Sequence, residues 1–174
     1  HYNHPKKNFI RKGASLKNVS RLIYILSKNP GKLKEINAIL SSYSIKLRSL
    51  YQDYSPGEVI ETGSSYAENA LLKAHRGFEV SGKICVGEDS GLEIDALEGA
   101  PGLLSARFGG EKLETKEKNQ RILDLLKDIP PDQRSACFVC VVALVWKNGE
   151  KIFEGRCPGL IALESRGNSG FGYD

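Results

Sequence analysis

The amino-acid sequence predicts an α/β fold built on a mixed β-sheet. Two observations lead to this prediction. Apolar runs of strand length alternate with amphipathic helical patterns in the first half of the chain, and strand patterns dominate the second half. A chain of 174 residues is long enough for a single domain with a buried core. Its 40% hydrophobic and 26% charged residues are the balance of a globular protein, which argues against wholesale disorder.

The individual elements follow from short periodic patterns separated by turn residues. The run 22–26 is apolar and of strand length, and the longer run 137–146 turns at Asn148-Gly149, a dipeptide typical of hairpins. In chain order we expect strands at 22–26 and 45–50, helices at 30–41 and 65–81, a strand at 84–86 that resumes at 92–95, a helix at 115–127, and strands at 137–146, 151–153 and 159–163.

Residues with capping roles mark the ends of two of these helices. Asn29 is a plausible N-cap, because its side-chain oxygen can accept hydrogen bonds from the free N–H groups of the first turn, and Pro30 suits the first helical position. Ser65 and Glu68 have the spacing of a capping box, and Gly82 suits the end of the same helix.

The positive charge of the chain is concentrated at its N-terminal end. Lys and Arg number 25 and Asp and Glu 21, which gives a formal net charge of +4. Residues 1–21 contain no acidic residue, so residues 22–174 are slightly acidic. We expect 1–21 to be a basic, disordered extension and 22–174 to be the folded domain. A cloning remnant, part of an organelle transit peptide and an arm that touches nucleic acid are open interpretations of the extension. For the domain itself, nucleic acid is not an expected partner.

Targeting signals and cysteine usage favour the cytoplasm. The first 20 residues lack the apolar centre of a secretory signal, and the apolar run 136–146 is shorter than the roughly 20 residues that a membrane span requires. The four cysteines lie in or near apolar stretches, as in proteins of reducing compartments. Cys137 and Cys140 form a CxxC pair, but residues three apart on a strand face opposite sides of a sheet. Core packing is therefore favoured over a zinc or redox centre.

The turn between the first strand and the first helix, residues 27–32, is a candidate phosphate site. A helix start presents free backbone N–H groups and a partial positive charge. Lys32 in the first helical turn opposes the helix dipole, a conflict that an anionic ligand would relieve. A solvated lysine on an ordinary helix start is the alternative, and the Walker pattern Gly-x-x-x-x-Gly-Lys-Ser/Thr does not occur in the sequence.

Glu88 and Asp89 form an acidic pair just after a strand. We expect Ser90-Gly91 to break the strand, so that the two carboxylates need not face opposite sides. Paired carboxylates at a strand end are typical Mg²⁺ ligands where phosphate binds, and one of them could instead orient or deprotonate a water. A solvated turn is the alternative. Glu61, ahead of a glycine and a helix start, is ambiguous on its own.

The stretch 166–174 is rich in glycine and contains two aromatic residues. Glycines let the backbone approach a ligand closely, and Phe171 and Tyr173 offer flat faces to a base. A flexible tail is the alternative. Serine-triad and zinc chemistry have no support, because neither Gly-x-Ser-x-Gly nor His-Glu-x-x-His occurs in the sequence.

Together these segments resemble the inosine triphosphate pyrophosphatase family, the house-cleaning enzymes that act on non-canonical purine nucleoside triphosphates. The matching segments, which follow the family's order from about Leu22 to the end of the chain, are Lys28-Asn29-Pro30-Gly31-Lys32, residues 61–70 (ETGSSYAENA), residues 88–92 (EDSGL) with 99–107 (GAPGLLSAR), and residues 170–174 (GFGYD). The resemblance implies a long curved mixed β-sheet flanked by helices, with two lobes and a central cleft, usually in a homodimer.

The resemblance also implies a role for each matched position. The triphosphate would be held by Ser27, Asn29 and Lys32, and Ser90 would contact the substrate. Mg²⁺ would be bound by Glu61 and Asp89 with support from Glu88. Asp89 would also position or deprotonate the attacking water, and Lys32 would neutralise charge on the leaving pyrophosphate. The purine would stack on Phe171, in a pocket lined by Gly172, Tyr173 and Asp174.

The implied reaction is Mg²⁺-dependent hydrolysis of ITP, dITP and XTP to the nucleoside monophosphate and pyrophosphate, with water attacking the α-phosphorus. Family members usually continue past the position of Asp174 with a lysine and a Ser-His-Arg motif that complete base recognition, so we expect the domain to be C-terminally incomplete. The alternative is a truncated, catalytically inactive module that binds nucleotides without turnover.

Overall fold

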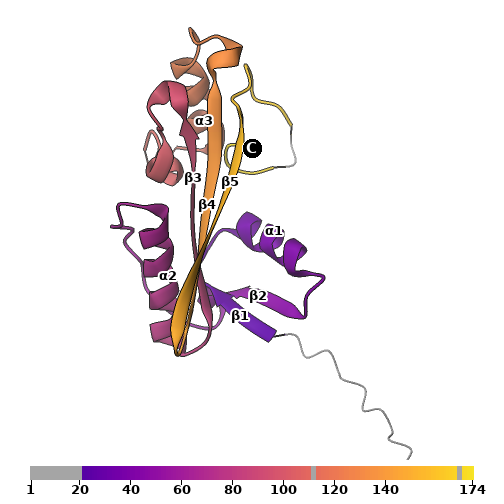
Figure 1. Ribbon diagram of the computed structural model, residues 1–174, viewed down its shortest axis with the longest axis vertical. Helices are drawn as coiled ribbons and strands as arrows, with labels where there is room; N and C mark the ends of the chain where they lie inside the picture. The colour runs from indigo at the N-terminus through magenta and orange to yellow at the C-terminus, as the bar shows by residue number, and fades with distance from the viewer. Residues whose placement is uncertain (1–20, 111–112, 168–169) are drawn as a thin grey trace, which may run out of the picture.

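The computed structural model describes residues 21–110, 113–167 and 170–174 (Figure 1). The expected extension 1–21 lies outside the described residues apart from Arg21, which already belongs to the first strand. The elements are, in order, β1 (Arg21–Ile25), α1 (Pro30–Leu40), β2 (Ile45–Ser49), η1 (Leu50–Gln52), α2 (Tyr66–Ser81), β3 (Cys85–Ile94), η2 (Asp95–Leu97), η3 (Gly102–Arg107), α3 (Thr115–Leu125), η4 (Pro131–Gln133), β4 (Ser135–Trp146) and β5 (Gly149–Leu160).

The sheet has five strands in the order β2-β1-β3-β4-β5. β1 pairs in parallel with β2 and β3, and the pairs β3–β4 and β4–β5 are antiparallel. Helical crossovers give parallel neighbours, whereas the tight turn at Lys147 and Asn148 reverses the chain into β5. The predicted α/β fold with a mixed sheet is confirmed.

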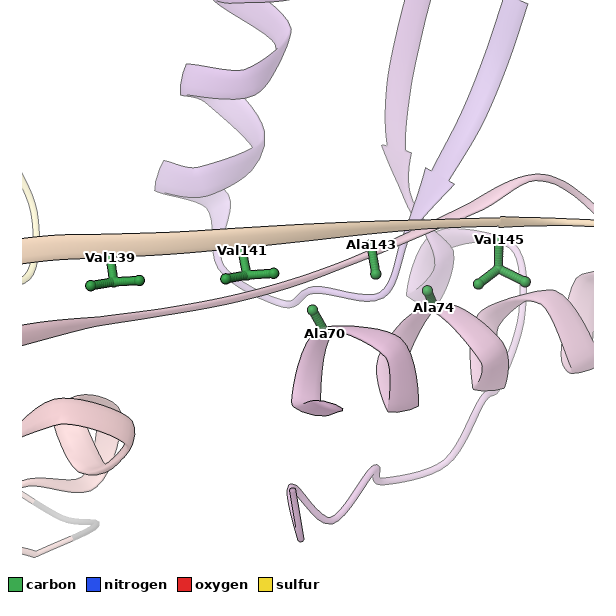
Figure 2. Packing of buried hydrophobic residues seen from close by; sticks show 6 residues of the cluster. All are labelled: Ala70, Ala74, Val139, Val141, Ala143 and Val145. Atoms are coloured by element: carbon green, nitrogen blue, oxygen red, sulfur yellow. The ribbon is translucent and has the colours of Figure 1, made fainter. Parts of the chain in front are cut away.

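Helices α1 and α2 cover opposite faces of the sheet (Figure 1). On β4, Val142 and Leu144 pack in the cluster that includes α1. The alternating residues Val141, Ala143 and Val145 instead face Ala70 and Ala74 of α2, as Figure 2 shows. Side chains alternate along a strand, and residues paired between β3 and β4 face the same side of the sheet. Glu88, paired with Val142, therefore faces the α1 side, and Asp89, paired with Val141, faces the α2 side.

Helix α2 approaches β3 closely because small residues line the contact. A Cβ atom on Gly87 would lie 1.9 Å from the carbonyl oxygen of Ala70, so the backbone of the helix occupies the space where a side chain would stand. This close approach places the polar side of α2, with Asn69 and Lys73, against the middle of β3.

The predicted helix caps are confirmed with one change of partner. Asn29 accepts hydrogen bonds from the N–H groups of Gly31 and Lys32. Ser65 Oγ accepts from the N–H of Glu68, but the Glu68 carboxylate bonds Ser64 instead of returning to the N–H of Ser65.

The predicted break at Ser90-Gly91 was wrong. β3 continues from Cys85 to Ile94, and every residue pairs with β4. The long antiparallel ladder outweighs the weak strand preference of a Ser-Gly pair. Gly91 is needed here for another reason: a Cβ on it would lie 2.3 Å from the carbonyl oxygen of Gly102, where η3 crosses the strand.

The late strands also differ from the prediction. The segments expected at 151–153 and 159–163 belong to one strand, β5, which follows β4 along its whole length. Pro158 is tolerated within it because β5 is an edge strand, where a missing N–H breaks no ladder on the open side.

The cysteine prediction holds in part. Cys85 is buried, and Cys137 packs beside the cluster on the α2 face, whereas Cys140 and Cys157 are exposed. Cys137 and Cys140, the two cysteines of the CxxC pair, therefore lie on opposite faces as expected, but Cys140 faces a cavity instead of a core.

The long strands β3 and β4 connect two parts of the molecule (Figure 1). One part contains β1, β2, α1 and α2, and the other contains η3, α3 and the C-terminal end. None of the helices in the described part of the chain has the length and apolar character needed to cross a membrane.

Candidate functional site

A cavity of about 460 Å³ lies on the α1 face of the sheet, between the two parts of the molecule. Its walls come from α1, β3, β4, the end of η3, the first turn of α3 and the C-terminal turn. The predicted site residues that line it are Asn29, Lys32, Glu88, Ser90, Phe171, Gly172, Tyr173 and Asp174. Segments far apart in the sequence therefore meet at one place.

The start of α1 is shaped by its own side chains. The Oδ1 atom of Asn29 lies 2.9 Å from the N atom of Gly31 and 3.2 Å from that of Lys32. Ser27 Oγ accepts from the N–H of Asn29 at 3.1 Å, and Ser27 is not among the residues lining the cavity. Ser27 and Asn29 thus hold the turn in shape, and the Lys32 side chain reaches the cavity.

Lys32 connects α1 to β3 through two contacts. Its Nζ atom lies 2.5 Å from Glu88 Oε2 and 3.0 Å from Ser90 Oγ. Glu88 is only 6% exposed, and the lysine offsets the cost of burying its charge. The other Glu88 oxygen accepts from Cys140 Sγ, and burial, followed by the charge of Glu88, raises the pKa of that thiol to about 11. Lys32 and Ser90 therefore present an ammonium and a hydroxyl to the cavity.

Asp89 belongs to a second cluster on the α2 face. Its Oδ2 atom accepts from Asn69 Nδ2 at 3.1 Å, and its Oδ1 atom lies 3.4 Å from Lys73 Nζ. The same ammonium lies 2.7 Å from Glu61 Oε1, so Glu61 and Asp89 share one cation. Burial raises the pKa of the Asp89 carboxyl, and Lys73 and Asn69 oppose that shift.

The structure separates the three carboxylates expected around Mg²⁺. Glu61 and Asp89 converge on Lys73, while Glu88 lies on the other face with Lys32. Within the described ranges, no group of three or more His, Cys, Asp or Glu side chains is placed to hold a metal ion. A site built on Glu61 and Asp89 would need further ligands, which phosphate oxygens and water commonly supply to Mg²⁺.

An open strand edge joins the two faces. Among the described residues, β1 pairs with β3 through Tyr24–Cys85 and Ile25–Val86, the N–H of Leu26 bonds the carbonyl of Val86, and the N–H of Leu92 bonds Ser105 Oγ of η3. Between these two points β3 has β4 on one side only. A ligand that crosses this edge would reach Lys32 on one face and Lys73 on the other.

The C-terminal turn is closed on itself and anchored at Tyr173. Asp174 Oδ2 accepts from the N–H of Phe171 at 2.9 Å, and Gly172 has a φ of 63°, which favours glycine. Tyr173 donates its hydroxyl to the carbonyl of Ser105 at 2.7 Å, and burial raises the pKa of its phenol. Tyr173 thus ties the turn to η3.

Phe171 is the exposed aromatic residue of that turn. It is 37% exposed and lines the cavity. A Cβ on Gly31 would lie 2.9 Å from its ring, so the ring packs directly over the start of α1. The aromatic surface and the lysine-bearing helix are therefore adjacent.

No role was predicted for Asn69 from the sequence, although it lies in the matched segment 61–70, and Lys73 was not singled out. They lie four residues apart on α2, so they share one side of the helix, next to the Ala70 and Ala74 stripe. That spacing was the available signal for a functional role, because polar residues that border the apolar stripe of a helix lie at the edge of the contact between the helix and the sheet.

These observations define the class of protein: an α/β fold with a cavity that holds Lys32, Glu88 and the exposed ring of Phe171 on one face of β3, and with Lys73, Glu61 and Asp89 clustered on the other face. The chain belongs to the Ham1 family, whose model matches residues 23–174.

Relatives at close to 40% identity match most of the chain. The dITP/XTP pyrophosphatase of Desulforamulus reducens is 40% identical over 153 residues, which are 87% of this chain and 76% of the relative. The dITP/XTP pyrophosphatase of Dictyoglomus thermophilum is 44% identical over 157 residues, which are 88% of this chain and 76% of the relative. The resemblance seen in the motifs is thereby confirmed at the level of the family.

Solved structures agree with this assignment. The HAM1 protein from Coxiella burnetii superposes with a TM-score of 0.78 at 37% identity, covering 88% of this chain and 79% of that protein. The nucleoside-triphosphatase / dITP/XTP pyrophosphatase from Mycobacterium abscessus gives a TM-score of 0.72 at 44% identity, covering 88% of this chain and 81% of that protein.

Proposed function

We propose that this protein hydrolyses the non-canonical purine nucleoside triphosphates ITP, dITP and XTP to the monophosphate and pyrophosphate. The observation that carries the proposal is the open edge of β3, where Lys32 and Lys73 flank the strand from opposite faces and the ring of Phe171 lies on the Lys32 side, over the start of α1. The relatives named dITP/XTP pyrophosphatase support the choice of substrate.

The triphosphate would lie across this edge. Lys32 and Ser90 would bind phosphate oxygens from the α1 face, at the start of a helix whose N-terminus favours anions. Lys73 would approach from the α2 face. Ser27 and Asn29 would act by keeping the turn before α1 in shape. As negative charge develops on the leaving pyrophosphate, Lys32 would stabilise it.

Asp89 would act on the attacking water. It is held by Asn69 and Lys73, so its orientation is fixed before substrate binds. A carboxylate in that position can orient a water and accept its proton as the water attacks the α-phosphorus. Glu88 would balance the charge of Lys32 and orient it.

We also propose Mg²⁺ as the cofactor. Glu61 and Asp89 fit this role, since both are oxygen donors that already converge on one cation, the Lys73 ammonium. Bound there with phosphate oxygens, Mg²⁺ would neutralise charge on the transferred phosphate and the leaving group. Glu88 lies on the opposite face and would contribute to the site only through Lys32.

The purine would stack on Phe171 in the part of the cavity lined by Gly172, Tyr173 and Asp174. Selectivity would come from donors that face the 6-oxo group, because an amino group at that position would leave them unpaired. ATP is therefore expected to be a poor substrate.

Homodimer formation and a cytoplasmic location belong to the same proposal. All twelve residues of the edge strand β5 are exposed, among them Ile152, Phe153 and Leu160, which a second copy could cover. The four cysteines are free thiols, in keeping with a reducing compartment.

The direct test is pyrophosphate release from ITP, XTP and ATP in the presence of Mg²⁺. We expect faster release from ITP and XTP than from ATP, and a loss of about 100-fold or more in kcat for Asp89→Asn. Asp95→Asn, an exposed carboxylate at the end of β3, is the matched control and should retain activity. Equal rates with ATP, or full activity of Asp89→Asn, would refute the assignment. Nucleotide binding without pyrophosphate release would instead support the inactive binding module.

A further inference from the structure

Asn119 of α3 contacts the C-terminal turn. Its Nδ2 atom donates a hydrogen bond to the carbonyl oxygen of Gly172 at 3.3 Å. Gly172 lies between Phe171, which faces the larger cavity, and Tyr173, which anchors the turn to η3. Asn119 also lines a neighbouring cavity of about 310 Å³, and Tyr173 and Asp174 border both cavities.

The other half of the Asn119 amide has no hydrogen-bond partner in the part of the chain that the structure describes. Its Oδ1 atom is buried, and no donor among the described residues reaches it. The amide cannot be reversed without loss, because reversal would place Oδ1 against the Gly172 carbonyl oxygen. A buried acceptor without a donor lowers stability, and an apolar side chain of similar shape would avoid that cost. Fold stability therefore does not explain an asparagine at this position.

Positioning of the turn does explain it. Among the described residues, side-chain hydrogen bonds of Tyr173 and Asn119 connect the turn to the rest of the structure, and the bond between Phe171 and Asp174 lies within the turn. Tyr173 fixes one end. Asn119 fixes the carbonyl of Gly172, the glycine at φ 63°, and so sets the direction in which the chain presents Phe171.

We propose that Asn119 is a positioning residue for the purine site, acting through the Gly172 carbonyl on the ring of Phe171. The part of this inference that concerns the purine rests on the proposed function. The part that concerns the turn is independent of any substrate.

Asn119→Leu tests both parts, with Gln120→Leu as the matched control one residue along α3. Gln120 is exposed and bonds only Asp124 among the described side-chain contacts. In Asn119→Leu without nucleotide, we expect amide hydrogen exchange in residues 170–174 to be about fivefold to tenfold faster, as for the loss of one hydrogen bond. The Tm should stay equal or rise. KM for ITP should rise by about the same factor, with kcat within about twofold.

Gln120→Leu should leave all four quantities at their wild-type values. Asn119→Asp provides a second variant of the same size, in which an oxygen replaces the donor and faces the Gly172 carbonyl; it should also exchange faster. Unchanged exchange in both Asn119 variants would overturn the proposal, and so would a steep fall in Tm together with kcat, which is the result for a structural residue. A wild-type chain that does not cleave ITP would overturn the proposed function, while the exchange experiment would still decide the role of Asn119.

Discussion

Glu88 and Asp89 are neighbours in β3, yet they face opposite sides of the sheet and bond different lysines, Lys32 of α1 and Lys73 of α2. The unbroken strand causes this separation, because consecutive side chains alternate. In the protein without a ligand, the Lys32 ammonium balances the charge of Glu88, and the Lys73 ammonium balances that of Asp89. A bound triphosphate would compete with these carboxylates for the lysine ammonium groups. A metal ion is therefore expected to be needed when the nucleotide is bound, because it would offset the added negative charge.

Lys73 forms ion pairs with both Glu61 and Asp89, so its removal should leave the two carboxylates without a positive charge nearby. We expect Lys73→Met to lower the free energy of unfolding by about 2–3 kcal/mol, because a buried carboxylate loses its charged partner. Mg²⁺ should then raise the Tm of Lys73→Met by more than it raises the wild-type Tm. Thermal unfolding with and without MgCl₂ measures this. An equal Mg²⁺ effect in both proteins would contradict a metal site on Glu61 and Asp89.

Lys32 is expected to act on the substrate as well as on Glu88. Lys32→Ala should raise KM for ITP by about tenfold to 100-fold, the range for a lost charged hydrogen bond. It should also lower stability, because Glu88 stays buried. The double variant Lys32→Ala/Glu88→Gln should recover stability without recovering KM.

Steady-state kinetics and chemical denaturation measure the two effects of Lys32 separately. Lys34→Ala, an exposed lysine on the same helix, is the control and should behave as wild type. Recovery of KM in the double variant would mean that Lys32 serves the fold alone.

Phe171 is predicted to supply the stacking surface for the base. Phe171→Leu removes a flat ring but keeps an apolar side chain, and KM for ITP should rise by about fivefold to 100-fold, as for one lost base stack. Phe171→Trp should keep most of the affinity, because it preserves a flat face. Tyr43→Leu, which changes an exposed aromatic residue outside the cavity, should have no effect. If Phe171→Leu bound ITP as tightly as wild type, the base would have to lie elsewhere.

Gly87 is expected to be essential for the packing of α2. A Cβ at this position would meet the carbonyl oxygen of Ala70 at 1.9 Å, so Gly87→Ala should push the helix from the strand and destabilise the fold by about 3 kcal/mol or more. Gly155→Ala on β5 meets nothing within 4 Å and should cost little. Urea denaturation of the two variants compares them directly. Similar stability of both variants would show that the helix can shift at low cost.

Local signals in the sequence predicted the helix starts and the hairpin. Asn29 and Ser65 cap their helices through bonds to N–H groups two or three residues away, and Asn148 lies in a two-residue turn. Such interactions depend on neighbours in the chain, so their pattern is readable without the fold. The break expected at Ser90-Gly91 failed because a ladder with distant β4 residues decided the conformation there.

The candidate site likewise has features that local sequence patterns predict and features that depend on long-range contacts. Local patterns predicted which segments form the candidate site: the helix start with Lys32, the acidic pair Glu88 and Asp89, and the aromatic turn at Phe171. How these segments combine depends on the fold, because long-range strand pairing assigns each β3 side chain to a face and brings α2 against one face of β3. The partnership of Lys73 with Glu61 and Asp89 and the contact of Asn119 with Gly172 depend on elements that meet only after folding, so no local pattern encodes them.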